Sequence, residues 1–120
     1  MSEATSPPAH DTSRWKSSAP IRYPDPDIMV LDPRFQSLVL GNAAIERIAT
    51  GFRFTEGPAY YGDGRYLLFS DIPNDALLRW DEISGAVATL RHPAGYPDGN
   101  TRDREGRLLS CELGSRTLTR

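Results

Sequence analysis

Residues 55–69, TEGPAYYGDGRYLLF, and residues 97–109, PDGNTRDREGRLL, share one layout. Each segment places a carboxylate before a glycine near its start, passes through a turn that ends in Gly-Arg, and finishes in an apolar run. Asp98 follows Glu56 by 42 residues, and the Gly-Arg pair repeats at the same interval. A period of roughly 40 to 45 residues built from short strands is typical of a β-propeller blade. The sequence therefore predicts an all-β fold assembled from blades.

Short apolar runs separated by turn residues are predicted as the four strands of the first blade. These runs are residues 58–61, 66–70, 76–80 and 86–90. A second blade begins near Asn100 and contains three strands by Arg120. Because a propeller needs roughly four to eight blades, we expect this chain to be a fragment of a longer protein, with about one and three-quarter blades.

Three regions are expected along the chain. Residues 1–26 are rich in Ser, Thr, Pro and Ala and have few side chains to bury, so they are predicted to form a disordered N-terminal leader. Residues 27–55 are predicted to be a connecting segment, in which Asp32-Pro33 has the N-cap and first-turn proline of a short helical turn. Residues 56–120 are predicted to hold the first blade and part of the second.

Composition argues against several kinds of partner. The 14 Lys and Arg residues against 16 Asp and Glu residues leave a formal charge of −2, which gives no attraction for phosphate backbones or anionic membranes. We therefore expect neither nucleic acid nor a membrane as a partner. The lone Cys111 cannot form an internal disulfide, and a buried, inert thiol is predicted there. No secretory signal or membrane-spanning run is visible, so the expected location is cytoplasmic.

Glu56 and Asp98 are the predicted metal ligands. Since equivalent positions of successive blades lie side by side around a central channel, the two carboxylates should converge there. Carboxylate oxygens are hard ligands that suit Ca²⁺ or another divalent cation. A simpler interpretation stays open, in which Glu56 caps a turn or pairs with an arginine and Asp98 belongs to the β-turn of residues 97–100. Asn100 either binds substrate or satisfies that same turn.

The sequence also carries an ordered set of longer motifs. They are IMVLDPRF at residues 28–35, TEGP at 55–58, LFSDIPN at 68–74, LRWD at 78–81 and GNTRDREGRL at 99–108. Together these motifs resemble the N-terminal part of the SMP-30/gluconolactonase family, and the match covers about residues 23–120. The resemblance implies a six-bladed propeller with one divalent cation, Ca²⁺ or else Zn²⁺, at the channel mouth. It also implies the hydrolysis of sugar lactones.

The same resemblance assigns roles to single residues. Glu56 matches the glutamate of the family's E-G-P motif, which is its first metal ligand. Asp98 matches a second-blade position, usually asparagine, that acts as a ligand or substrate contact. The aspartate is a departure, because its extra charge should raise metal affinity and lower the electrophilicity of the ion. Leu113 is a second departure from the family pattern, since many relatives have histidine at this position. The remaining ligands and the general base are expected beyond Arg120.

The leading hypothesis is a metal-dependent hydrolase with a small-molecule lactone as substrate. The chain by itself is expected to be inactive and poorly soluble, because it lacks ligands, base and neighbouring blades. One alternative is a non-catalytic propeller that binds a partner through its loops. Another is a hydrolase of other esters on the same metal site, since the metal ligands do not specify the substrate.

Overall fold

The computed structural model describes residues 13–16 and 19–120 of the chain. The chain divides into two compact units, one formed by residues 1–47 and the other by residues 48–120. In the part of the chain that is described, no helix is both long enough and apolar enough to cross a membrane.

An ion pair organises the described part of the first unit. Of the predicted leader, residues 1–12 and 17–18 lie outside the described residues, and Ser13–Trp15 forms a short 3₁₀ helix, η1. Arg14 Nη2 lies 2.7 Å from Oδ2 of Asp25, whose exposed fraction is 4%. The hydrogen bond from Arg14 is the main reason that the pKa of Asp25 is lowered. A second 3₁₀ helix, η2, spans Pro33–Leu38.

The start of η2 follows the capping pattern of the sequence. Asp32 has extended backbone, and its Oδ1 accepts a hydrogen bond from the N–H of Arg34 at 2.8 Å. Pro33 occupies the first helical position, where its missing N–H costs nothing. The predicted helical turn after Asp32 is confirmed.

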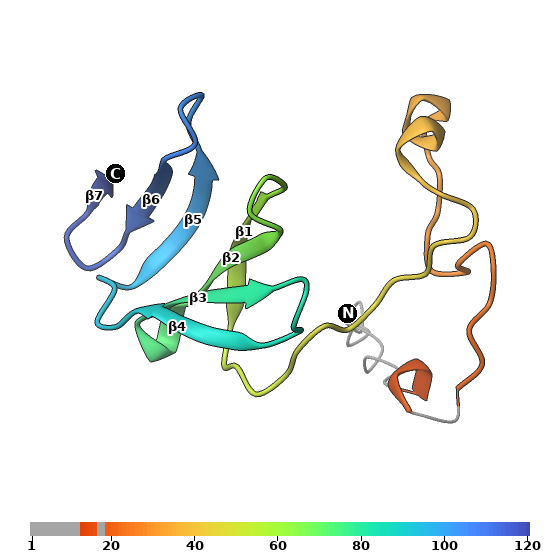
Figure 1. The fold of residues 1–120 in the computed structure, drawn as a ribbon, viewed down its shortest axis with the longest axis horizontal. Coiled ribbons are helices and arrows are strands. Elements are labelled where there is room, and N and C mark those ends of the chain that lie inside the picture. The colour runs from red at the N-terminus through yellow and green to blue at the C-terminus, as the bar shows by residue number, and fades with distance from the viewer. Residues whose placement is uncertain (1–12, 17–18) are drawn as a thin grey trace, which may run out of the picture. The chain divides into compact units, whose positions relative to one another are not determined.

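The second unit consists of two antiparallel sheets (Figure 1). The first sheet has the order β1-β2-β3-β4, and its strands are β1 (Thr55–Tyr61), β2 (Tyr66–Asp71), β3 (Ala76–Asp81) and β4 (Val87–Arg91). The second has the order β5-β6-β7, with β5 (Pro97–Arg102), β6 (Leu108–Glu112) and β7 (Thr117–Thr119). A short 3₁₀ helix, η3 (Ile72–Asn74), joins β2 to β3. The all-β prediction is confirmed, and every predicted strand matches an observed one to within a few residues.

Aspartate side chains close two of the hairpin turns. Asp81 Oδ1 accepts from the N–H of Ser84 at 2.8 Å. Asp103 Oδ1 accepts from the N–H groups of Glu105 and Arg107, each at 2.9 Å. The backbone hydrogen bond from Ser84 is the largest cause of the lowered pKa of Asp81, and the backbone hydrogen bond from Arg107 is the largest cause for the pKa of Asp103. Short polar side chains that satisfy turn amides explain why these positions end their strands.

The two faces of the first sheet bury different side chains. One face carries the buried cluster of Ala59, Tyr61 and Leu68, with Tyr66 and Leu108 packed against it. The opposite face carries Phe69, Ala76 and Leu78, with Phe52, Leu67, Trp80 and Val87 packed against it. Because Leu108 belongs to β6, the first cluster joins the two sheets. Full burial of a leucine contributes about 1.5–3 kcal/mol, and Leu108, which is only partly buried, contributes less than this to the association of the sheets.

Candidate metal and substrate site

The two carboxylates of the sequence repeat lie at or beside irregularities of β1 and β5. The pairing of β1 with β2 shifts between Glu56 and Ala59, and the pairing of β5 with β6 shifts between Pro97 and Asn100. A bulge bends its strand and redirects the side chains on it. Both first strands are therefore irregular beside the carboxylate, but one residue out of step. Glu56 is paired with Ser70 just before the bulge in β1, whereas Asp98 lies within the bulge in β5.

Gly57 allows the two bulges to meet. Its φ is +61°, in the left-handed region that favours glycine. A Cβ atom at this position would lie 2.4 Å from the backbone oxygen of Asp98 and 2.7 Å from Nδ2 of Asn100. No other residue could fit without moving β5 away from β1. The glycine of the E-G-P sequence is thus required because the backbones of β1 and β5 approach closely at this position.

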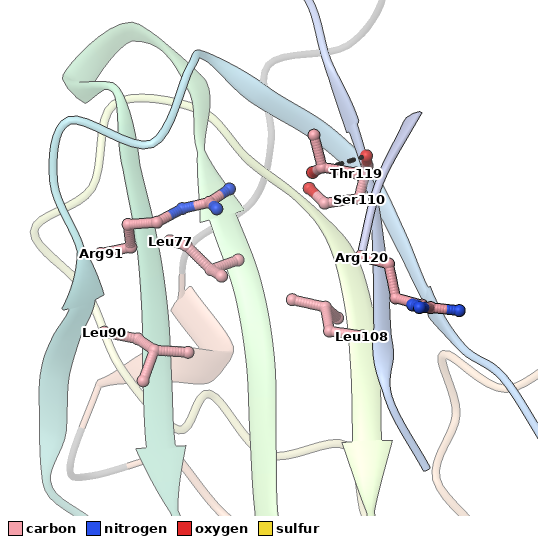
Figure 2. Close-up of a pocket in the computed structure, with 7 residues that line it drawn as sticks. All are labelled: Leu77, Leu90, Arg91, Leu108, Ser110, Thr119 and Arg120. Carbon is pink, nitrogen blue, oxygen red and sulfur yellow. Dashed lines mark hydrogen bonds between the residues drawn. The ribbon is translucent and has the colours of Figure 1, made fainter. Parts of the chain in front are cut away.

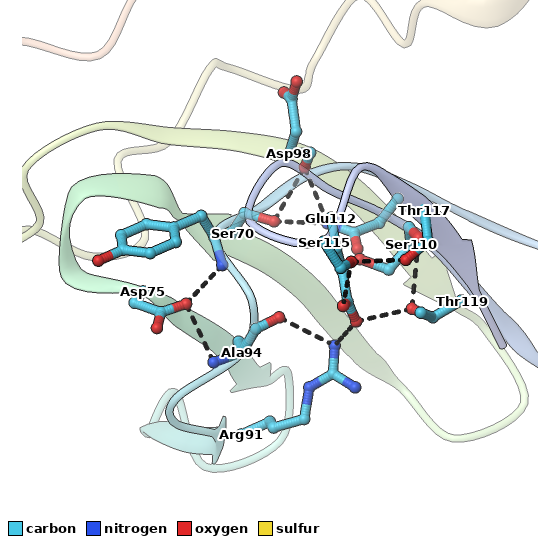
Figure 3. A network of polar contacts seen from close by, with 12 residues as sticks. Ser70, Asp75, Arg91, Ala94, Asp98, Ser110, Glu112, Ser115, Thr117 and Thr119 are labelled. Carbon is cyan, nitrogen blue, oxygen red and sulfur yellow. Dashed lines mark hydrogen bonds and ion pairs between the residues drawn. The ribbon is translucent and has the colours of Figure 1, made fainter.

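Asn100 and Ser70 connect the two bulges by hydrogen bonds. Asn100 Nδ2 donates to the backbone oxygen of Gly57 at 3.0 Å and to Oγ of Ser70 at 2.7 Å. Ser70 Oγ in turn donates to the backbone oxygen of Asp98 at 2.9 Å. Ser70 is completely buried, with 0% exposure. Figure 3 shows the carboxylate of Asp98 directed away from Ser70, while its backbone carbonyl faces the serine hydroxyl.

The structure brings the side chains of Glu56 and Asp98 together. A side-chain hydrogen bond with Asp98 raises the pKa of Glu56 above its ordinary value, and desolvation and charge repulsion act in the same direction. Two neighbouring carboxylates repel each other when both are charged, which is why the pKa of one of them rises. A cation between them would remove the repulsion.

The donor set fits a cation that prefers oxygen. The paired groups are carboxylates, which suit Ca²⁺, and Ca²⁺ takes six to eight oxygen ligands. Among the described residues, no group of three or more His, Cys, Asp or Glu side chains is arranged to hold a metal ion. Glu56 and Asp98 therefore supply two side chains toward such a site, and a full coordination shell would need further ligands.

A small hollow lies beside Glu56. Its volume is about 220 Å³, and it is lined by Ile48, Ala49, Phe52, Thr55, Glu56, Pro58, Leu67 and Phe69. Glu56 is the one ionisable residue in this lining, which otherwise consists almost entirely of apolar side chains. The carboxylate thus borders an apolar surface on β1 and β2.

A second hollow of about 240 Å³ lies between the two sheets (Figure 2). Its lining consists of Leu77, Leu90, Arg91, Leu108, Ser110, Thr119 and Arg120. Arg91 is already engaged, since its Nη2 lies 2.8 Å from Oε1 of Glu112 and 3.2 Å from the backbone oxygen of Ala94. Thr119 also donates to Glu112, and this hydrogen bond is the main cause of the lowered pKa of Glu112. We attribute this hollow to the packing of one sheet on the other.

Two other acidic residues have structural partners. Asp71, the last residue of β2, is 2% exposed and accepts from the N–H of Phe54 at 3.1 Å and from Nδ2 of Asn74 at 2.7 Å. The carboxylate of Asp75 accepts from the N–H groups of Ala94 and Tyr96 in the connection between the sheets (Figure 3). Its partners lie about twenty positions away, and no local pattern in the sequence indicated them.

The prediction of a buried Cys111 is wrong, because the free thiol is exposed. Side chains alternate along β6, and the inward position is occupied by Ser110, with 2% exposure. The apolar character of cysteine favoured burial in the sequence analysis, but the register of the strand decides which neighbour faces the other sheet.

Comparisons with known proteins support the resemblance noted from the motifs. No family model matches the chain. The chain is 27% identical over 104 residues to a gluconolactonase of Zymomonas mobilis subsp. mobilis, a match that covers 76% of this chain and 29% of the relative. A solved gluconolactonase of Xanthomonas campestris, described as important in glucose secondary metabolic pathways, matches with a TM-score of 0.58 and 34% identity. That match covers 61% of this chain and 24% of the other.

A further solved structure, assigned by its name to gluconolactonase, matches with a TM-score of 0.63 and 31% identity over 73% of this chain and 30% of that one. The chain resembles gluconolactonases in both sequence and fold, as the motifs predicted. It spans less than a third of the length of each of these relatives.

Proposed function

We propose that this chain contributes two metal ligands to a metal-dependent lactone hydrolase of the gluconolactonase kind. In this proposal, the first sheet is a propeller blade and the second sheet is part of the next one. The observation that carries the proposal is the convergence of the Glu56 and Asp98 side chains from the irregular parts of β1 and β5. The similarity to gluconolactonases supplies the substrate class, a small lactone.

Glu56 and Asp98 would hold the cation through their carboxylate oxygens. Ca²⁺ is our first choice and Zn²⁺ the second, because the pair offers only hard oxygen atoms. When bound, a divalent cation supplies Lewis-acid polarisation of an ester carbonyl. Residues of this chain would orient that cation, and we assign the general base to none of them.

The charge of the pair should influence the chemistry. Two anionic ligands in close contact repel each other at neutral pH, as the raised pKa of Glu56 indicates. Cation binding removes this repulsion, so part of the affinity comes from relief of an unfavourable contact. The second negative charge also donates electron density to the cation, and an aspartate at position 98 should therefore favour binding over polarising power.

The proposal is tested by Ca²⁺ calorimetry and by glucono-lactone hydrolysis with the protein that carries this chain. Glu56→Gln should weaken Ca²⁺ binding by at least about tenfold and remove most of the hydrolysis, since it deletes one anionic ligand. The matched control is Glu105→Gln, because Glu105 is an exposed residue of the β5–β6 turn. The control should keep both properties. If Glu56→Gln binds Ca²⁺ as tightly as the unaltered protein, Glu56 is not a ligand and the proposed site is wrong.

A further inference from the structure

We propose that Ser70 and Asn100 are a positioning pair that sets the separation of Glu56 and Asp98, and that Asn100 holds backbone rather than substrate. This inference rests on the proposed metal site, since it states how the two ligands are held in place. It assigns Asn100 a different role from the substrate contact predicted from the sequence.

The contacts of Asn100 fix the orientation of its amide. Its Nδ2 faces the backbone oxygens of Gly57 and Asp98, at 3.0 and 3.3 Å. Carbonyl oxygens accept hydrogen bonds and cannot donate them, so the atom that faces them must be the NH₂ nitrogen. Rotating the amide by half a turn would place Oδ1 against two carbonyl oxygens. The side chain is therefore bound through its donors to both bulges at once.

Ser70 is linked to both proposed ligands. In the pairing of β1 with β2 it lies opposite Glu56. Its Oγ accepts from Asn100 Nδ2 at 2.7 Å and donates to the backbone oxygen of Asp98 at 2.9 Å. The hydroxyl thus connects the strand partner of Glu56 to the main chain that carries Asp98. Complete burial keeps this link away from competing water.

The environment of the amide oxygen indicates the role of Asn100. Oδ1 of Asn100 is buried and has no hydrogen-bond partner among the described residues. Leaving a buried acceptor unpaired is costly, whereas the opposite side of the same amide has three acceptors within hydrogen-bonding distance. The residue is thus placed for its donors, and these hold the backbone.

Groups that orient metal ligands typically change metal affinity by 10- to 100-fold when they are removed. We therefore expect Asn100→Asp, which keeps the shape but replaces the donors with acceptors, to weaken Ca²⁺ binding by at least about tenfold in calorimetry. Ser70→Ala should have a similar effect, and Ser70→Thr should restore affinity because it keeps the hydroxyl. Thr101→Ala is the matched control, since Thr101 is exposed on the same strand.

The outcomes separate the possible roles of Asn100. If Asn100→Asp binds Ca²⁺ equally well or more tightly, the residue is a direct ligand or a bystander, and the positioning role is wrong. If Ca²⁺ affinity is kept and only the KM for the lactone rises, Asn100 contacts substrate and the proposal fails. A lower Tm with unchanged Ca²⁺ affinity would show a purely structural residue, and it would also overturn the proposal.

A separate experiment tests the positioning role if the proposed metal site is wrong. In that case the unaltered protein shows no Ca²⁺ binding, and the positioning role is judged in the metal-free protein. Nuclear Overhauser contacts between Gly57 and Asp98 should be lost in Asn100→Ala and kept in Thr101→Ala. If these contacts persist without the Asn100 side chain, the amide does not hold the two bulges together.

Discussion

Asn100 Nδ2 lies 3.0 Å from the backbone oxygen of Gly57, a residue 43 positions earlier in the chain. This single contact joins the first strand of one sheet to the first strand of the next, next to the carboxylates of Glu56 and Asp98. Because it acts where both strands are irregular, we expect it to influence the positions of these side chains as well as the packing of the sheets. Changes at this junction should therefore affect stability and ligand geometry together.

Gly57→Ala should be strongly destabilising. The new methyl group would lie 2.4 Å from the backbone oxygen of Asp98, and alanine would have to adopt a φ of +61°. We expect a loss of about 2 kcal/mol or more in the free energy of unfolding, measured by urea denaturation. Gly41→Ala is the control, because nothing lies within 4 Å of its added Cβ. Equal stabilities of the two variants would show that the close approach of β1 and β5 is not required.

Leu68→Ala should weaken the contact between the two sheets. Leu68 is 4% exposed and belongs to the cluster against which Leu108 packs. Truncation of a buried leucine costs about 2–5 kcal/mol through lost burial and the cavity left behind. Leu38→Ala is a suitable control, since Leu38 is 77% exposed. A thermal melt in which both variants behave like the unaltered protein would contradict the observed core.

Asp71→Asn should remove a stabilising contribution that depends on pH. Burial alone would raise the pKa of Asp71, but the hydrogen bonds from Phe54, Asn74 and Arg53 together lower it below the ordinary value of 3.8. A lowered carboxyl pKa stabilises the fold above pH 3.8, and this stabilisation is lost as the pH falls through the folded-state value. The variant should lose about 2 kcal/mol at pH 7 and much less near pH 2.

Urea midpoints measured between pH 7 and pH 2 test this pH dependence of the Asp71 contribution. Asp63→Asn is the control, because the side chain of Asp63 is 82% exposed. A stability difference between Asp71→Asn and the unaltered protein that stays constant down to pH 2 would mean that the carboxylate charge of Asp71 contributes nothing.

Much of the fold could be predicted because its signals are local. The Asp32-Pro33 cap, the apolar runs of β1 to β4 and the turn before Leu108 depend on neighbouring residues, and the structure agrees with each. The repeat also predicted that Glu56 and Asp98 would lie close together, and the irregular parts of β1 and β5 do bring these two side chains together.

Other features depend on contacts that the sequence does not show. The hydrogen bonds of Asp75 to the connection between the sheets join residues about twenty positions apart. The outward position of Cys111 follows from the register of β6, and a shift of one residue would have reversed it. The donors of Asn100 reach back to β1, so its local β-turn context gave no indication of them.

Asp98→Asn should restore the residue that the family resemblance favours at this position. The amide keeps an oxygen ligand and removes one negative charge, so we expect a folded protein with Ca²⁺ affinity reduced by less than about tenfold and hydrolysis kept or increased. Calorimetry and lactone hydrolysis measure the two effects. Complete loss of both would mean that the Asp98 carboxylate supplies something an amide cannot, such as proton transfer.

The central claim is that Glu56 and Asp98 bind one cation together, and a double-mutant cycle in Ca²⁺ affinity tests it most directly. Calorimetry would compare the unaltered protein, Glu56→Gln, Asp98→Asn and the double variant. Ligands of one ion are coupled, so the effect of Asp98→Asn should change by at least about 0.5 kcal/mol when Glu56 is already glutamine. Affinities that add within experimental error, or a protein that binds no Ca²⁺ in any form, would contradict a shared site.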